Sequence, residues 1–142
     1  MHDPDKAQDE IIQSFAVFSD WLDRYQYLID LGRKLPPLAE SEKSDDRLLA
    51  GCQSRVWLIM EGNPEEIRIR ANSDAAIVSG LIALLINVYS GCSARQILNS
   101  HPYFIDQIGL TEHLSPTRAN GLHAMLNAIR SFAERQTQAE FS

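Results

Sequence analysis

The feature that most constrains the fold is a change of hydrophobic pattern in the middle of the chain. Residues 56–60, Val-Trp-Leu-Ile-Met, form a continuous apolar run, and residues 62–64, Gly-Asn-Pro, are typical of a turn. Apolar and polar residues then alternate over 66–71, which is the period of a strand with one exposed face. The sequence therefore predicts an antiparallel hairpin whose first strand is buried on both faces, with residues 48–50 as a candidate third strand.

The segments before and after this hairpin have the 3.6-residue period of helices. We expect helices over 5–17, from Ser19 to Gly32, over 75–90, over 94–99 and from Pro116 into the C-terminal region, with one or two further turns over 102–108. The helix over 75–90 is apolar nearly all round, so it is predicted to be the central buried helix. Residues 36–47 have the composition of a loop. Helices around a small antiparallel sheet of about three strands indicate an α+β fold.

Particular residues are expected to cap these helices. The expected caps are Asp5 with Gln8, Ser19, Ser73 with Asp74, and Ser93 with Gln96, and Pro116 is expected at the first helical position of the last helix. With 142 residues the chain favours one domain over 1–142, and we expect its ends, 1–9 and 136–142, to be loosely ordered.

Charge and composition exclude several classes of function. The 19 acidic against 13 basic residues give a net charge of -6, which argues against a nucleic-acid partner. The start of the chain has no basic and apolar signal-peptide pattern, and the longest apolar stretch, 75–89, is shorter than the ~20 residues of a membrane span. Two cysteines are too few for a secreted disulfide scaffold. We therefore expect a cytoplasmic protein with no membrane partner.

Cys52 is the first candidate for chemistry because it lies between the expected loop and the first strand. A thiol reacts as the thiolate, which needs access and usually a nearby cation, and Arg55 is a candidate cation. Gly51 leaves room for a second molecule to approach the sulfur. The alternative is that Cys52 is a small buried hydrophobic residue, and Cys92, just after the central helix, is expected to have that structural role.

Metal and nucleotide sites have little support in the sequence. The four histidines have no HxxxH or HExxH spacing, and there is no CxxC pair, so we expect no metal site. There is also no GxGxxG or GxxxxGK[ST] motif. Gly121, near the start of the last helix, indicates close packing or the close approach of a partner. Arg118 lies in the first turn of that helix, where a cation is slightly unfavourable unless it has a function.

Three motifs taken together closely resemble the SufE family. They are Gly51-Cys52-Gln53-Ser54-Arg55-Val56-Trp57, then Asp74 followed by Ala75-Ala76-Ile77-Val78-Ser79-Gly80-Leu81, and finally Leu114-Ser115-Pro116-Thr117-Arg118-Ala119-Asn120-Gly121-Leu122. The resemblance spans roughly residues 10–135. It implies an α+β domain related in fold to the IscU-type iron–sulfur scaffolds. It also implies that Cys52 is the essential cysteine of the family.

The resemblance implies a function as well. Cys52 would accept persulfide sulfur from a SufS-like cysteine desulfurase, stimulate that enzyme, and pass the sulfur to an iron–sulfur scaffold complex. The pyridoxal phosphate belongs to the desulfurase, so no cofactor is expected here, and the chain would be an accessory protein rather than a stand-alone enzyme. The residues expected to contact the partner are Gly51, Gln53, Arg55, Asp74, Arg118 and Gly121. The oligomeric state stays open, a homodimer included.

Two alternatives from other classes remain at this point. A thiol redox protein would use Cys52 as the attacking and Cys92 as the resolving cysteine, which requires Cα atoms less than ~7 Å apart. An iron–sulfur scaffold would follow from the fold relationship, but two cysteines are fewer than the thiolate ligands that such a cluster usually needs.

Overall fold

The hairpin predicted from the change of pattern is present. In this computed structural model, which describes residues 2–140, strands β1 (Val56–Asn63) and β2 (Glu66–Ser73) pair antiparallel, from Val56 opposite Ser73 to Asn63 opposite Glu66. Within these residues the sheet has only these two strands. The prediction of a third strand over residues 48–50 is wrong, because this segment contributes only a single bridge, between Leu48 and Trp57.

The first strand is less buried than predicted. Only Val56 of β1 is fully buried, and the strand becomes exposed towards the hairpin turn. The register explains this, because Trp57 and Ile59 lie opposite the polar Asn72 and Arg70 and so share the outward face with them. The inward face of β2, with Ile67, Ile69 and Ala71 buried, agrees with the predicted alternation.

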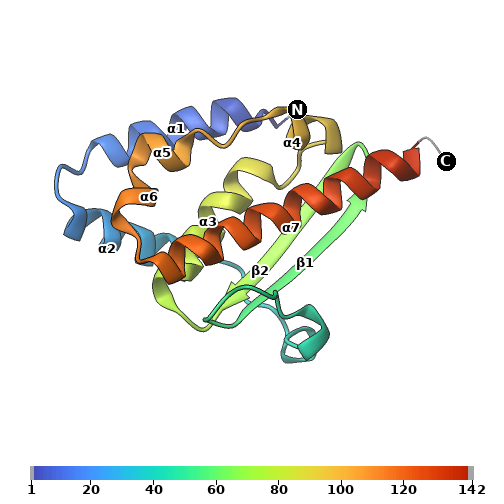
Figure 1. Ribbon diagram of the computed structural model, residues 1–142, viewed down its shortest axis with the longest axis horizontal. Coiled ribbons are helices and arrows are strands. Elements are labelled where there is room, and N and C mark those ends of the chain that lie inside the picture. Colours follow the sequence, from blue (N-terminus) through green and yellow to red (C-terminus); the bar gives the residue numbers. More distant parts are fainter. Residues whose placement is uncertain (1, 141–142) are drawn as a thin grey trace.

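In the described part of the chain there are seven α-helices, and α3 and α7 lie beside the hairpin (Figure 1). They are α1 (Pro4–Ala16), α2 (Trp21–Arg33), α3 (Ala76–Tyr89), α4 (Ala94–Asn99), α5 (Phe104–Ile108), α6 (Leu110–His113) and α7 (Pro116–Glu140). The predicted loop over 36–47 contains two short 3-10 turns, η1 (Glu40–Glu42) and η2 (Asp45–Arg47). Of the end segments that we expected to be loosely ordered, 1–9 and 136–142, residues 4–9 belong to α1 and residues 136–140 to α7. Residues 1 and 141–142 lie outside the described residues, and the loose order of the ends stays a prediction.

The helix ends confirm some of the expected caps and correct others. The Ser93–Gln96 capping box and the position of Pro116 are as predicted. The predicted caps of the first two helices are wrong. Asp3 caps α1 in place of Asp5, and Asp20 caps α2 in place of Ser19, each accepting from free N–H groups of the first turn. Asp and Ser are about equally good caps, so sequence preference does not separate neighbouring candidates.

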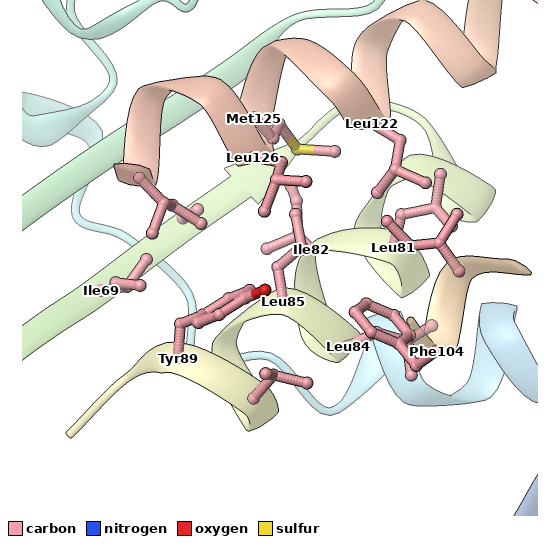
Figure 2. Close-up of a cluster of buried hydrophobic side chains, with 14 of the residues drawn as sticks. Ile69, Leu81, Ile82, Leu84, Leu85, Tyr89, Phe104, Leu122, Met125 and Leu126 are labelled. Atoms are coloured by element: carbon pink, nitrogen blue, oxygen red, sulfur yellow. The ribbon is translucent and has the colours of Figure 1, made fainter. Parts of the chain in front are cut away.

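The core forms around α3, as predicted from its apolar composition. Figure 2 shows Leu81, Ile82 and Leu85 of α3 among the side chains of α7, including Met125 and Leu126. These residues are at most 7% exposed. On its other side α3 approaches α2 closely, since a Cβ on Gly80 would lie 2.2 Å from the carbonyl oxygen of Leu28. The core therefore fixes α7 against the hairpin, which matters for the site described next.

No helix among the described residues has the length and apolar character needed to cross a membrane. The most apolar helix, α3, has 14 residues, against the ~20 that a span requires.

Candidate functional site

Cys52 lies in a short loop at the open end of the hairpin. We call residues 50–55 the Cys52 loop. The backbone N–H of Leu49 donates to the carbonyl oxygen of Val56 (2.9 Å), which closes the loop on itself. Gly51 has a φ of +89°, a backbone conformation that residues with a side chain rarely adopt. The loop therefore turns back immediately before Cys52.

Asp74 fixes the downstream end of this loop. Its carboxylate accepts the N–H of Arg55 (3.0 Å), and its own N–H donates to the carbonyl oxygen of Arg55 at 3.3 Å. The sequence predicted that Asp74 would cap α3, but Ala75 occupies the cap position and Ser73 accepts the N–H of Ala75. Asp74 is committed to the loop instead, which is the physical reason for this correction.

The sulfur of Cys52 lies against the start of α7. Its thiol donates to the carbonyl oxygen of Gly121 at 3.8 Å, a long and weak hydrogen bond. A Cβ on Gly121 would lie 3.6 Å from this sulfur, and one on Gly51 would lie 3.4 Å from the Cβ of Ala124. At 3.6 Å the added Cβ would make only an ordinary contact, so close packing does not by itself require glycine at position 121. The other explanation that the sequence offered, the close approach of a partner, remains a prediction. The thiol is half-buried and packs against the core.

Burial sets the acidity of the resting thiol. It raises the pKa of Cys52 above its ordinary value of 9.0, and burial is the cause of the shift. Arg55, the candidate cation, does not offset this effect. The resting Cys52 is therefore mostly a protonated thiol at neutral pH, which is a poor nucleophile.

The structure brings some of the predicted site residues together and leaves others apart. Gly51, Cys52 and Gly121 meet where the loop touches α7, and Arg55 is joined to Asp74. Gln53 and Arg118 are exposed. The described contact of Arg118 is its backbone N–H, which donates to the hydroxyl of Ser115 at the start of α7 (3.3 Å). Contact with a partner remains a prediction for all of these residues.

Cys92 lies at the opposite end of the hairpin. Its backbone pairs with Ile67, which is opposite Gly62, whereas Cys52 precedes Val56 at the other end of β1. The strand from 56 to 62 spans roughly 20 Å at ~3.3 Å per residue, far beyond the reach of a disulfide. Cys92 is fully buried, and burial together with Asp3 raises its pKa to about 12. The two-cysteine redox alternative finds no support in this arrangement.

Some contributions to the site were not visible in the sequence. The packing of the Cys52 loop on Ala124, and the bridge from Leu48 to Trp57 that leads into the loop, involve ordinary apolar residues with no motif. In the described residues, 2–140, no three His, Cys, Asp or Glu side chains gather as a metal site would require.

Comparison with known families agrees with the motifs around this loop. Residues 9–133 match the family model described as "SufE: Fe-S metabolism associated domain". The chain belongs to the SufE family. The match contains every predicted site residue, from Gly51 to Gly121, and the family description connects such domains with Fe–S metabolism.

A solved structure shows the same fold. It is the solution structure of a hypothetical protein from Thermus thermophilus, with a TM-score of 0.75 and 22% sequence identity. The superposition covers 97% of this chain and 99% of the other. At this identity the likeness concerns the α+β fold alone, and it agrees with the fold expected for a SufE domain.

Proposed function

We propose that this SufE-family protein accepts persulfide sulfur at Cys52 from a pyridoxal-phosphate cysteine desulfurase. The observation that carries the proposal is the placement of Cys52. It lies in a loop fixed at both ends, while the sulfur itself is held by a long hydrogen bond to Gly121. A sulfur held in this way can leave α7 at little cost when a partner binds.

The transfer is a thiol–disulfide type of exchange. The Cys52 thiol first loses its proton, and its sulfur then attacks the outer sulfur of the donor's persulfide. The sulfur–sulfur bond of the donor breaks, and the donor cysteine leaves as a thiolate. Cys52 then carries the persulfide, and no net oxidation or reduction takes place.

Burial and release of the sulfur control this reaction in opposite directions. Against α7, the raised pKa of Cys52 keeps the thiol protonated and protects it from bulk reagents. Away from α7 the desolvation that raises the pKa is relieved, so the thiolate forms more readily. The same shelter would protect the bound persulfide, which reductants and oxidants attack.

The proposed partners follow from the same scheme. The donor is a SufS-like desulfurase, which supplies the pyridoxal phosphate, so this chain needs no cofactor of its own. A downstream iron–sulfur scaffold complex receives the sulfur. The exposed Gln53, Arg55 and Arg118 are available for contact with the donor, and the protein acts as an accessory carrier.

Intact-protein mass spectrometry tests this function directly. The protein is incubated with the desulfurase, pyridoxal phosphate and L-cysteine, and analysed without reductant. We expect a gain of ~32 Da, one sulfur atom, that is lost on reduction. Cys52→Ser should abolish the gain, and the matched control Cys92→Ser should retain it. A gain that disappears in Cys92→Ser would instead favour the two-cysteine alternative, and no gain in the folded wild type would refute the proposal.

A further inference from the structure

The loop that precedes Cys52 is fastened to the outward face of the hairpin. We call residues 36–47 the strap. Asn72 of β2 holds its first part: the side-chain oxygen accepts the N–H of Leu38 (2.8 Å), and the side-chain amide donates to the carbonyl oxygen of Pro36 at 3.2 Å. One amide side chain thus binds both a donor and an acceptor of the strap backbone, as a neighbouring strand would do.

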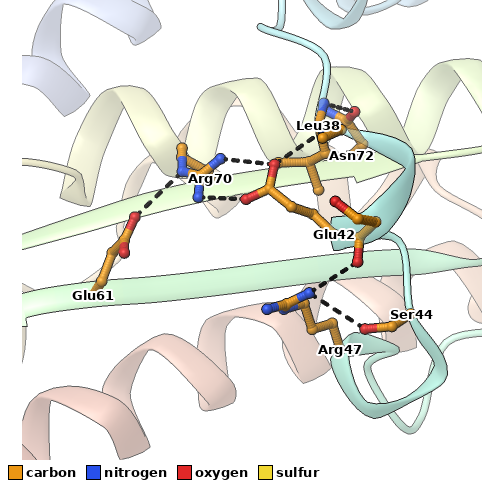
Figure 3. A network of polar contacts seen from close by, with 9 residues as sticks. Leu38, Glu42, Ser44, Arg47, Glu61, Arg70 and Asn72 are labelled. Carbon is orange, nitrogen blue, oxygen red and sulfur yellow. Dashed lines mark hydrogen bonds and ion pairs between the residues drawn. The ribbon is translucent and has the colours of Figure 1, made fainter.

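Arg70 of β2 holds the middle of the strap. Its guanidinium donates to both carboxylate oxygens of Glu42, at 2.7 and 3.2 Å, and to Glu61 of β1 at 3.4 Å (Figure 3). Glu42 also accepts the N–H of Ala39 (3.0 Å). These hydrogen bonds lower the pKa of Glu42 to about 2, with Arg70 as the first cause. The carboxylate is therefore charged throughout the neutral range.

The geometry of the ion pair between Arg70 and Glu42 allows it to hold the strap in place, although it is exposed. Most exposed ion pairs add little to stability, because water screens them and long side chains lose freedom. Arg70 and Glu42 differ because the contact is bidentate, and because each of them also binds a further group of the hairpin or the strap. The geometry is specific enough to fix where the strap lies.

The end of the strap leads directly into the Cys52 loop. Leu48 follows the strap and bridges to Trp57, and the ammonium of Lys43 in the strap lies 5.7 Å from the centre of the Trp57 ring. Leu49 then closes the Cys52 loop through its bond to Val56. The upstream end of the loop is therefore positioned by the strap, just as Asp74 positions the downstream end.

We propose that Arg70 and Asn72 are positioning residues for Cys52. Their described hydrogen bonds go to the strap and the hairpin and not to Cys52. They act through the strap, which keeps the upstream end of the loop in place and the thiol against Gly121. Release of the strap loosens the bridge from Leu48 to Trp57 and lets the thiol leave α7 more often. The importance of this control for sulfur transfer rests on the function proposed above.

The rate at which Cys52 is alkylated in the native protein tests this proposal. Wild type and the variants Arg70→Gln, Glu42→Gln and Asn72→Ala are treated with iodoacetamide at pH 8, and peptide mapping by mass spectrometry separates Cys52 from Cys92. We expect the rate at Cys52 to rise several-fold in each variant. The double variant Arg70→Gln/Glu42→Gln should react no faster than the faster single variant, because both changes remove one contact.

A matched control separates positioning from a general loss of charge or stability. Arg33→Gln removes another exposed ion pair, the one to Asp30 on α2 (3.5 Å), outside the strap. Its alkylation rate at Cys52 should equal that of wild type. Unchanged rates in the strap variants would overturn the proposal, and so would a parallel increase at buried Cys92, which would indicate global unfolding. No desulfurase is used, so this result is independent of whether Cys52 accepts sulfur.

Discussion

The two ends of the hairpin place the same chemical group in opposite situations. At the turn end, Cys92 is fully buried, its backbone pairs with β2, and its thiol donates to the carbonyl oxygen of Val88 at 3.5 Å. At the open end, Cys52 is half-buried in a loop, with a long contact to Gly121. Both pKa values are raised by burial, but Cys92 is a buried member of the core whereas Cys52 is a partly buried residue packed against its edge. The difference in burial is therefore the basis for predicting that Cys52 reacts and that Cys92 has a structural role.

The largest expected effect is a difference in alkylation rate between the two cysteines. In native protein at pH 8 we expect Cys52 to react at least about 100-fold faster than Cys92, because a pKa of about 12 leaves roughly one Cys92 thiol in 10,000 ionised, even before its lack of access is considered. Both rates should rise with pH as the thiols deprotonate. Peptide mapping by mass spectrometry over pH 6–9 measures this. Equal rates, or a faster Cys92, would contradict the comparison.

A smaller effect is expected when α7 is changed where it shelters the sulfur. Gly121→Val places methyl groups where the Cys52 sulfur packs, so the loop should be displaced and alkylation should become several-fold faster. Gly121→Ala is the matched control, because its Cβ would lie at an ordinary 3.6 Å from the sulfur. Alanine should leave the rate nearly unchanged and stabilise α7 by up to ~1 kcal/mol. Thermal unfolding and alkylation rates measure both, and equal rates in the two variants would refute a sheltering role for Gly121.

The smallest expected effect concerns Arg118, whose side chain is exposed on the first turn of α7. Arg118→Ala should weaken stimulation of the desulfurase a few-fold, while the free energy of unfolding changes by less than ~0.5 kcal/mol. Titration of desulfurase turnover against the variant measures the loss, with Arg33→Ala as the control on a different helix. If melting temperature and stimulation fall together, Arg118 has a packing role and not a partner contact.

Much of the fold was predictable because it follows from periodicity. The hairpin, the central helix α3 and the start of α7 at Pro116 all come from local patterns of apolar residues and turn or cap residues. The prediction of a third strand failed. Leu48 and its neighbours have the composition of a strand, but side chains of β2 hold the strap that precedes them, and residues 48–50 form only one bridge to β1. Such tertiary contacts have no local signal.

The candidate site also has a part that local sequence predicts and a part that depends on tertiary contacts. Cys52 and its motif could be recognised directly, whereas the roles of its neighbours depend on contacts between segments far apart in the chain. Asp74 has the sequence position of a cap, and only the structure shows that it holds Arg55. Arg70 and Asn72 are polar residues of an alternating strand, which predicts an exposed face and nothing about the strap.

The closure of the Cys52 loop at Leu49 and Val56 also limits how far the sulfur can travel. Cys52 is three residues from Leu49, and an extended chain spans at most ~3.6 Å per residue, so its Cα stays within about 11 Å of that fixed point. Under the function proposed above, a donor would have to bring its persulfide to the Cys52 sulfur while the Cα stays within this radius. The length of the loop would then limit how deep a donor pocket Cys52 can reach.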